Sequence, residues 1–272
     1  MASCGLVNSM ELSIWLWCLG GGALAGLLAG LLGIGGGLVV VPLLIYLLPI
    51  LGVAPDIVVP SAIATSLATI CMTTASAALT HSRSGYLESF WLLRVLPGLS
   101  AGALIGAFLV TVVNPQWLKF IFATVLVLLS IRMLLPVPEG EPKTTVSKRL
   151  VALGAAVIGT ISGLVGIGGG ALTVPFLQRM RLPVRQAIAI SSLGSFVIGC
   201  SSVLMFVVNG WLGDKADGAL GLIYVPAWIA LSIASVSLAP FGAKLAHRLP
   251  VKLLRRVFAA FLIIVAINLL MK

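Results

Sequence analysis

The sequence predicts an all-α, polytopic membrane protein made of two homologous halves. Of its 272 residues, 60% are hydrophobic and only 9% are charged, whereas soluble domains average about 25% charged residues. The apolar residues form long stretches, most of them near the roughly 20 residues that a spanning helix needs. An internal repeat also covers almost the whole chain. These observations indicate the lipid bilayer as the surrounding medium.

Ten apolar stretches follow one another, at 12–33, 38–51, 57–80, 90–113, 117–135, 149–165, 170–178, 184–208, 219–243 and 251–271. Two of them, 38–51 and 170–178, are short and directly follow glycine-rich segments. We therefore expect about four full spanning helices in each half, plus a short or re-entrant helix. The expected organisation is a first repeat over 1–135, a cytoplasmic linker over 136–149 and a second repeat over 150–272.

The two halves align at their glycine-rich segments. Residues 29–44 read AGLLGIGGGLVVVPLL and residues 162–177 read SGLVGIGGGALTVPFL, with ten of sixteen positions identical at an offset of 133. The following helices share a small polar step, Thr65-Ser66-Leu67 in the first half and Ser191-Ser192-Leu193 in the second. Repeats of this size are the usual construction of secondary transporters.

The positions of Lys and Arg indicate how the halves are oriented. If the chain continues straight through each glycine segment, nine of the 17 basic residues fall on one side and eight on the other. If it turns back there, only Lys119, Lys215 and Lys272 fall on one side. The other fourteen are Arg83, Arg94, Arg132, Lys143, Lys148, Arg149, Arg179, Arg181, Arg185, Lys244, Arg248, Lys252, Arg255 and Arg256. Because positive charge gathers on the cytoplasmic side, we expect inverted repeats with both termini outside.

The same bias accounts for the formal charge of +10, so no nucleic-acid partner is expected. The four cysteines form no CxxC pair, which favours neither a metal site nor a disulfide framework, and no cofactor is expected. Cys71 and Cys200 occupy loosely corresponding places in the two halves, and a thiol role is a less favoured alternative for them. The chain contains no HExxH, GxSxG or GxxxxGK[ST] motif, so neither an enzyme nor a nucleotide-driven pump is indicated.

The glycine segments are the first candidate binding residues. They contain Gly33, Gly35, Gly36 and Gly37 in the first half and Gly166, Gly168, Gly169 and Gly170 in the second. Glycine tolerates positive φ and ends a helix, so a short helix is expected to start after each break. Its first amide groups would point at the break and could bind an anion. The alternative is that these glycines only let helices pack closely.

Hydroxyl groups supply the second set of candidates. Thr65, Ser66, Ser191 and Ser192 recur at matching places in both halves. They could donate hydrogen bonds to an oxyanion, or equally bond neighbouring helices to one another. No Asp or Glu lies in the middle of any apolar stretch, although a cation carrier normally needs one there. The expected substrate is therefore a small anion.

Over its full length, the chain resembles the TauE/SafE family of membrane permeases. The resemblance lies in the paired GxGGGxxxVP segments, the polar step that follows each of them and the repeated hydropathy pattern. The resemblance implies a carrier in the cytoplasmic (inner) membrane for sulfite or organosulfur anions such as sulfonates, mostly an exporter. Members are described with seven or eight spans, fewer than the ten segments counted here. The expected mechanism is secondary transport driven by a proton or potential gradient.

Two alternatives to a sulfur-anion carrier remain open. One is a carrier of another small anion, such as a carboxylate, and the other is a membrane assembly factor without transport of its own. A carrier should have a polar cavity flanked by both glycine breaks. An assembly factor should instead bury those glycines in contacts between helices.

Overall fold

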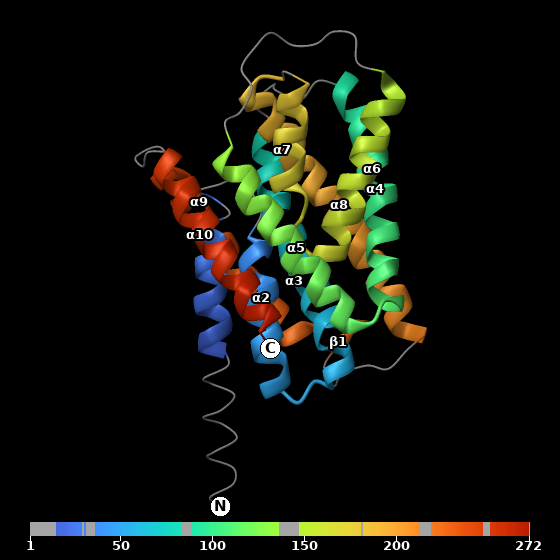
Figure 1. The fold of residues 1–272 in the computed structure, drawn as a ribbon, viewed down its shortest axis with the longest axis vertical. Coiled ribbons are helices and arrows are strands. Elements are labelled where there is room, and N and C mark those ends of the chain that lie inside the picture. Colours follow the sequence, from blue (N-terminus) through green and yellow to red (C-terminus); the bar gives the residue numbers. More distant parts are fainter. Residues whose placement is uncertain are drawn as a thin grey trace, which may run out of the picture.

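The computed structural model describes residues 15–28, 30, 36–82, 89–135, 147–180, 182–212, 219–246 and 251–271. Apart from one small hairpin, the regular structure in these residues is helical, which confirms the predicted fold class (Figure 1). The elements are a helix over Trp15–Leu28, α2 (Gly37–Ile50), α3 (Pro55–Ser82), α4 (Ser89–Val112), α5 (Pro115–Leu134), α6 (Lys148–Val165), α7 (Gly170–Arg179), α8 (Val184–Leu212), β1 (Ala219–Leu220), β2 (Ile223–Tyr224), α9 (Val225–Ala246) and α10 (Val251–Leu270).

Six of the described helices are long and apolar enough to cross a membrane, namely α3, α4, α5, α6, α8 and α9. The segments Trp15–Leu28, α2 and Arg256–Leu270 of α10 are apolar but shorter. The outer surface of the bundle suits lipid, since Leu93, Trp117 and Phe241 are 78%, 66% and 64% exposed. Large apolar side chains exposed in such number are unusual on a soluble monomer. The chain is therefore a multi-pass membrane protein.

One predicted helix begins later than expected. The apolar stretch 219–243 was expected to be helical throughout, but residues 219–224 form the β1–β2 hairpin and α9 starts at Val225. The turn contains Gly221 with φ of 65°, a value that glycine adopts without steric cost. The hairpin packs tightly on α8. If Gly210 carried a side chain, its Cβ atom would lie only 2.3 Å from the Cα of Gly221, so the two backbones approach too closely for any residue but glycine.

The chain reverses direction at each glycine break, as the distribution of basic residues predicts. In the first half, a Cβ on Gly21 would overlap the side chain of Leu43, so α2 runs back along the first helix. In the second half, a Cβ on Gly154 would lie 2.5 Å from the ring of Phe176, so α7 runs back along α6. The two contacts correspond to each other at the repeat offset of 133, since 154 − 21 and 176 − 43 both equal 133.

The two halves are interlocked through glycine-lined helix pairs. In α4 and α6, a Cβ on Gly102 would lie 2.0 Å from the carbonyl of Ala156, and a Cβ on Gly159 would lie 2.3 Å from the carbonyl of Leu99. The first helix meets α9 in the same way, with Gly26 against the backbone of Ser235. Small residues allow such close approach of helices in membranes. Glycines spaced four apart, as in Gly22–Gly26 and Gly159–Gly163, are the usual sequence pattern of such packing.

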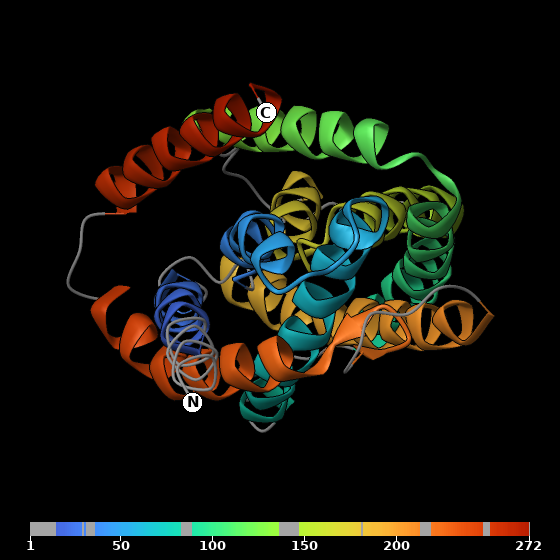
Figure 2. The same ribbon diagram turned by 90° about the horizontal axis from the view of Figure 1, so that it is seen from below.

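Corresponding helices of the two halves also pair directly. α5 and α10 lie together along one side of the bundle (Figure 2), where the hydroxyl of Ser130 donates to the carbonyl of Ala259 at 2.9 Å. The sequence colouring shows that the two helices run in opposite directions (Figure 1). α3 is the most enclosed of the spanning helices, with 78% of its apolar span buried against 33–44% for the other five. It therefore forms the centre around which the breaks are arranged.

Candidate functional site

The glycine breaks are held in a backbone conformation that favours glycine. Gly36 has φ of 48° and precedes α2, and Gly169 has φ of 78° and precedes α7. Gly166 and Gly168 also have positive φ, 77° and 76°. Side chains other than glycine rarely adopt these values. The predicted Gly33 and Gly35 lie outside the described residues.

The two breaks touch each other inside the bundle. A Cβ on Gly37 would lie 2.3 Å from the carbonyl oxygen of Gly166. Ser66, on α3, donates its hydroxyl to the same carbonyl at 3.0 Å. Ile70, one turn further along α3, lies against both breaks, because Cβ atoms on Gly37 and Gly168 would each lie 2.6 Å from its side chain. Segments about 130 residues apart in sequence thus form one buried junction.

The start of α7 places two amide groups that have no acceptor within the helix at this junction. The amides of Leu172 and Thr173 bond to the carbonyl of Gly169 at 3.0 and 2.8 Å. The two preceding amides, of Gly170 and Ala171, have no acceptor within the helix. Every residue from 162 to 170 is buried. A buried helix N-terminus, with a positive partial charge and N–H groups that the helix does not pair, favours an anion.

Two hydroxyl groups beside this helix start have no hydrogen-bond partner in the described structure. They belong to Ser162, at the end of α6, and to Thr173, in the first turn of α7. Ser162 is 0% exposed and Thr173 is 1% exposed. From the position that a Cβ on Gly169 would occupy, Ser162 Oγ lies 3.4 Å away and Thr173 Oγ1 lies 3.6 Å away. Since buried polar groups are nearly always paired, these two hydroxyls are available to bind a polar molecule.

This hydroxyl pair was not among the predicted site residues, although the sequence contains a signal for it. At the repeat offset of 133, Ser162 corresponds to Ala29 and Thr173 corresponds to Val40. Hydroxyls therefore replace apolar side chains at two positions of a segment that is otherwise largely shared. The exchange makes the second break more polar than the first.

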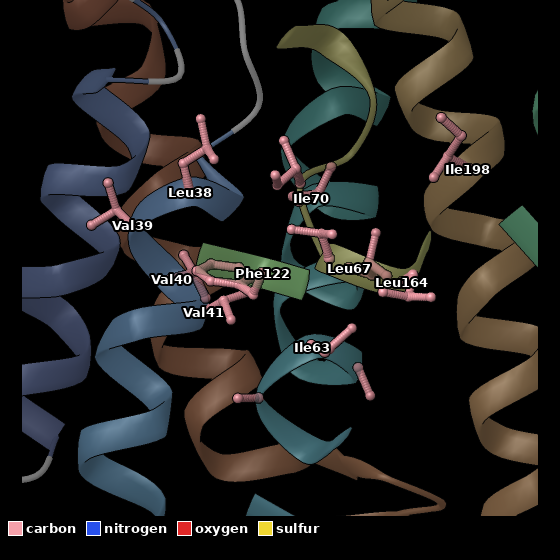
Figure 3. Packing of buried hydrophobic residues seen from close by; sticks show 14 of the residues in the cluster. Leu38, Val39, Val40, Val41, Ile63, Leu67, Ile70, Phe122, Leu164 and Ile198 are labelled. Carbon is pink, nitrogen blue, oxygen red and sulfur yellow. The ribbon is translucent and has the colours of Figure 1, made fainter. Parts of the chain in front are cut away.

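The side chain of Ile198 lies against the same point from α8. Its Cδ1 atom is 2.4 Å from the Cβ position of Gly169. Figure 3 shows Ile70 of α3 between Leu38, at the start of α2, and Ile198 of α8. The site thus combines donors from α6 and α7 with an apolar wall from α8. We refer to Ser162, Gly169, Gly170, Ala171 and Thr173 as the α7 site.

The four predicted hydroxyls occupy different surroundings. Ser66 bonds to the second break, as described above, and Ser191 lies near it, with its hydroxyl 3.5 Å from the carbonyl of Gly170. Thr65 accepts the amide of Tyr224 at 3.0 Å and thereby connects α3 to the hairpin. Ser192 donates to Ile188 within its own helix at 2.9 Å. The structure thus brings Ser66 and Ser191 to the breaks, while the hydroxyls of Thr65 and Ser192 bond elsewhere.

The α7 site contains no charged side chain, and the described residues include no cluster of metal-binding side chains. Arg94, one of the fourteen basic residues expected on the cytoplasmic side, places its guanidinium 3.4 Å from the centre of the Phe90 ring. This cation–π contact lies near the start of α4. Such a position is typical of a residue that anchors a helix at the membrane interface. The chemistry available at the site is hydrogen-bond donation by hydroxyl and amide groups.

Helices that break inside the bundle, with their ends meeting at a polar site, are typical of secondary transporters. Together with the apolar outer surface, this architecture defines the class as a multi-pass membrane transporter. The family model described as "Sulfite exporter TauE/SafE" matches residues 18–269. The chain belongs to the TauE/SafE family.

Relatives from several bacteria agree with this assignment. The chain is 37% identical over 260 residues to a "Probable membrane transporter protein" of Haemophilus influenzae, which covers 94% of this chain and 98% of the relative. It is 29% identical over 233 residues to "Probable membrane transporter protein YunE" of Bacillus subtilis, with coverages of 73% and 85%. A protein of Xylella fastidiosa with the same descriptive name is 29% identical over 259 residues, 92% of each chain. No solved structure matches the chain.

Proposed function

We propose that this transporter is a secondary carrier that exports small sulfur oxyanions, such as sulfite or sulfonates, across the cytoplasmic membrane. The observation that supports this proposal most directly is the pair of buried hydroxyls, of Ser162 and Thr173, that have no hydrogen-bond partner at the start of α7. The substrate class comes from the description of the matching family, which names a sulfite exporter. The proposed substrate contacts are these hydroxyls and the amides of Gly170 and Ala171.

The chemistry of the α7 site suits an oxyanion. The hydroxyls of Ser162 and Thr173 and the amides of Gly170 and Ala171 can each donate a hydrogen bond, and a sulfite or sulfonate group offers three oxygen atoms as acceptors. Hydrogen bonds to a charged acceptor are worth about 1.5–3 kcal/mol each. A helix N-terminus adds favourable electrostatics without a buried cation. Ile198 would restrict the size of the group that the site accepts.

The proposed transport cycle uses the two halves, 1–135 and 150–272, as inverted repeats. The opposite courses of α5 and α10 support this arrangement (Figure 1), and so do the equivalent contacts Gly21–Leu43 and Gly154–Phe176. With the basic loops on the cytoplasmic side, both termini lie outside the cell. A proton gradient or the membrane potential supplies the energy, since anion efflux is favoured by a negative interior.

The described conformation encloses the site. Residues 162–170 are buried, and two cavities among the described residues lie away from the α7 site. One, of about 200 Å³, lies beside Trp15, Cys18 and Ala227. The other, of about 250 Å³, lies beside Tyr46 and Asn268. A carrier must therefore open the site to one side of the membrane at a time, by movement of one half against the other.

The close packing of the breaks, with neither of the two described cavities at them, is the arrangement expected above for a second candidate, a membrane assembly factor in which the glycines serve helix contact alone. The two candidates differ in their need for the hydroxyls. An assembly factor has no use for two unpaired buried hydroxyls, which are costly to leave without partners. A carrier needs them for its substrate.

Transport into proteoliposomes tests the proposal. Purified protein is reconstituted, and the uptake of labelled sulfite, methanesulfonate and acetate is measured under an imposed potential that is positive inside. The proposal expects saturable uptake of sulfite or methanesulfonate that is lost in a Ser162→Ala/Thr173→Val variant. A Ser192→Ala variant is the matched control, because that hydroxyl bonds only within its own helix. Preference for acetate would indicate a carboxylate carrier, and no uptake of any anion by folded protein would contradict transport.

A further inference from the structure

Two cysteines meet where the central helices of the two halves cross. The sulfur atoms of Cys71, on α3, and Cys200, on α8, are 3.2 Å apart. The helices approach closely at this point because Gly199 has no side chain: a Cβ there would lie 3.0 Å from the Cβ of Cys71. A disulfide bond measures about 2.05 Å. The sulfurs thus need to approach by only about 1.1 Å more to form one.

The crossing lies next to the glycine breaks. Ile70, which precedes Cys71, packs against Gly37 and Gly168. Ile198, two residues before Cys200, packs against Gly169. The residues that cover the two breaks are therefore carried by the same short stretches of α3 and α8 as the thiols. A movement of α3 against α8 that separates Ile70 from Ile198 would also separate Cys71 from Cys200.

We propose that Cys71 and Cys200 form an oxidation site at which a disulfide joins the two halves and holds the carrier closed. The oxidant is a small, uncharged peroxide. One thiolate attacks the peroxide O–O bond, giving a sulfenic acid and hydroxide, and the second thiol displaces water from the sulfenic sulfur. In total, two thiols lose two electrons and two protons, and hydrogen peroxide is reduced to two molecules of water.

The two sulfur atoms differ in their access to a small oxidant. Cys200 is exposed on the outside of α8 and Cys71 is partly buried; because Cys200 lies within the candidate span Arg185–Gly210, the oxidant must be a small, uncharged molecule that enters the bilayer. By contrast, Cys18 is 1% exposed. The neighbouring hydroxyl of Ser201 points elsewhere, since it forms a 2.8 Å hydrogen bond with Ser100 of α4. Cross-linking is therefore specific to position 200 on α8.

The test separates the two halves after oxidation. A protease cleavage site is placed between Pro136 and Val146 in a Cys4→Ser/Cys18→Ala background, so that Cys71 and Cys200 are the remaining thiols. After hydrogen peroxide treatment and cleavage, the expected result on a non-reducing gel is one band of full-length mobility that dithiothreitol resolves into two halves. Separate halves after oxidation, or a product that joins two chains, would overturn the oxidation site.

A shifted thiol serves as the matched control. In a Cys200→Ser/Ser201→Cys variant the thiol moves by one residue, away from Cys71, and we expect no cross-link under the same conditions. Cross-linking with equal yield would show that α3 and α8 are not held as described. Neither cross-linking experiment measures transport, so their results do not depend on the proposed function.

The effect on transport is the second part of the proposal, and it rests on the proposed function. In proteoliposomes, peroxide should reduce anion uptake by the cross-linked fraction of the protein, and dithiothreitol should restore it. The Cys200→Ser variant should keep its uptake throughout. Undiminished uptake by fully cross-linked protein would contradict the closure of the carrier, while leaving the cross-link itself demonstrated.

Discussion

Replacing Thr173 by Val should raise the stability of the substrate-free protein and reduce the additional stability that the substrate provides on binding. The change substitutes a methyl group for a hydroxyl of nearly the same shape. In the described structure, Thr173 Oγ1 is buried without a hydrogen-bond partner. An unsatisfied buried polar group costs about 1–3 kcal/mol. The substrate-free Val variant should therefore gain a fraction of that amount, on the order of 1 kcal/mol.

With an anion present, the wild type should be stabilised more than the Thr173→Val variant. Loss of one hydrogen bond to a charged group, about 1.5–3 kcal/mol, raises the dissociation constant about ten- to a hundredfold. At a sulfite concentration one hundred times the wild-type dissociation constant, the ligand stabilises the wild type by about 2.7 kcal/mol. A variant that binds one hundred times more weakly is stabilised by about 0.4 kcal/mol under the same conditions.

Thermal unfolding in detergent, with and without sulfite, measures both effects. Thr160→Val is the matched control, because the hydroxyl of Thr160 bonds to the carbonyl of Ala156 in its own helix at 3.0 Å. The control should leave the sulfite response unchanged. The reasoning is refuted if Thr173→Val lowers the unfolding temperature without sulfite and retains the full sulfite shift.

Three further predictions concern the junction, the helix packing and the topology. Ser66→Ala should destabilise the protein by about 1–3 kcal/mol, because it leaves the buried carbonyl of the second break unpaired; an unchanged unfolding temperature would show that this bond contributes nothing. Gly102→Ala should destabilise by about 1–3 kcal/mol or more through overpacking against α6, whereas Gly20→Ala, with nothing within 4 Å of the added Cβ, should be nearly neutral. Equal losses for the two glycine variants would contradict the described α4–α6 contact. In a cysteine-free background, Pro142→Cys and Asp214→Cys should react with membrane-impermeant reagents from opposite sides of the membrane. Labelling of both from one side would refute the inverted arrangement.

The arrangement of the chain could be predicted from the sequence because it follows from patterns of composition. Apolar stretches correspond closely to helices, and the two short ones reappear as α2 and α7. The reversal at each glycine break followed from charge, since only a reversal gathers the basic residues on one side. The late start of α9 was not predicted, because the hairpin residues Ala219–Tyr224 are as apolar as the helix that follows them.

The roles of individual hydroxyls were harder to predict from the sequence. They depend on the direction in which each side chain leaves its helix as well as on its position along the chain. Thr65 and Ser66 are neighbours, yet consecutive side chains on a helix point about 100° apart. One therefore reaches the hairpin and the other reaches Gly166. Whether a hydroxyl is paired depends on contacts between residues 100 or more apart in the sequence, so the unpaired state of Ser162 and Thr173 was visible only in the structure.

Equilibrium binding of radiolabelled sulfite to purified protein tests the central claim most directly. It compares the wild type with the Ser162→Ala/Thr173→Val variant, after gel filtration has shown that both are folded. The account predicts saturable binding of one anion per chain, weakened at least a hundredfold in the variant because two hydrogen bonds to the anion are lost. Equal affinity in the two proteins would contradict the placement of the anion at the start of α7.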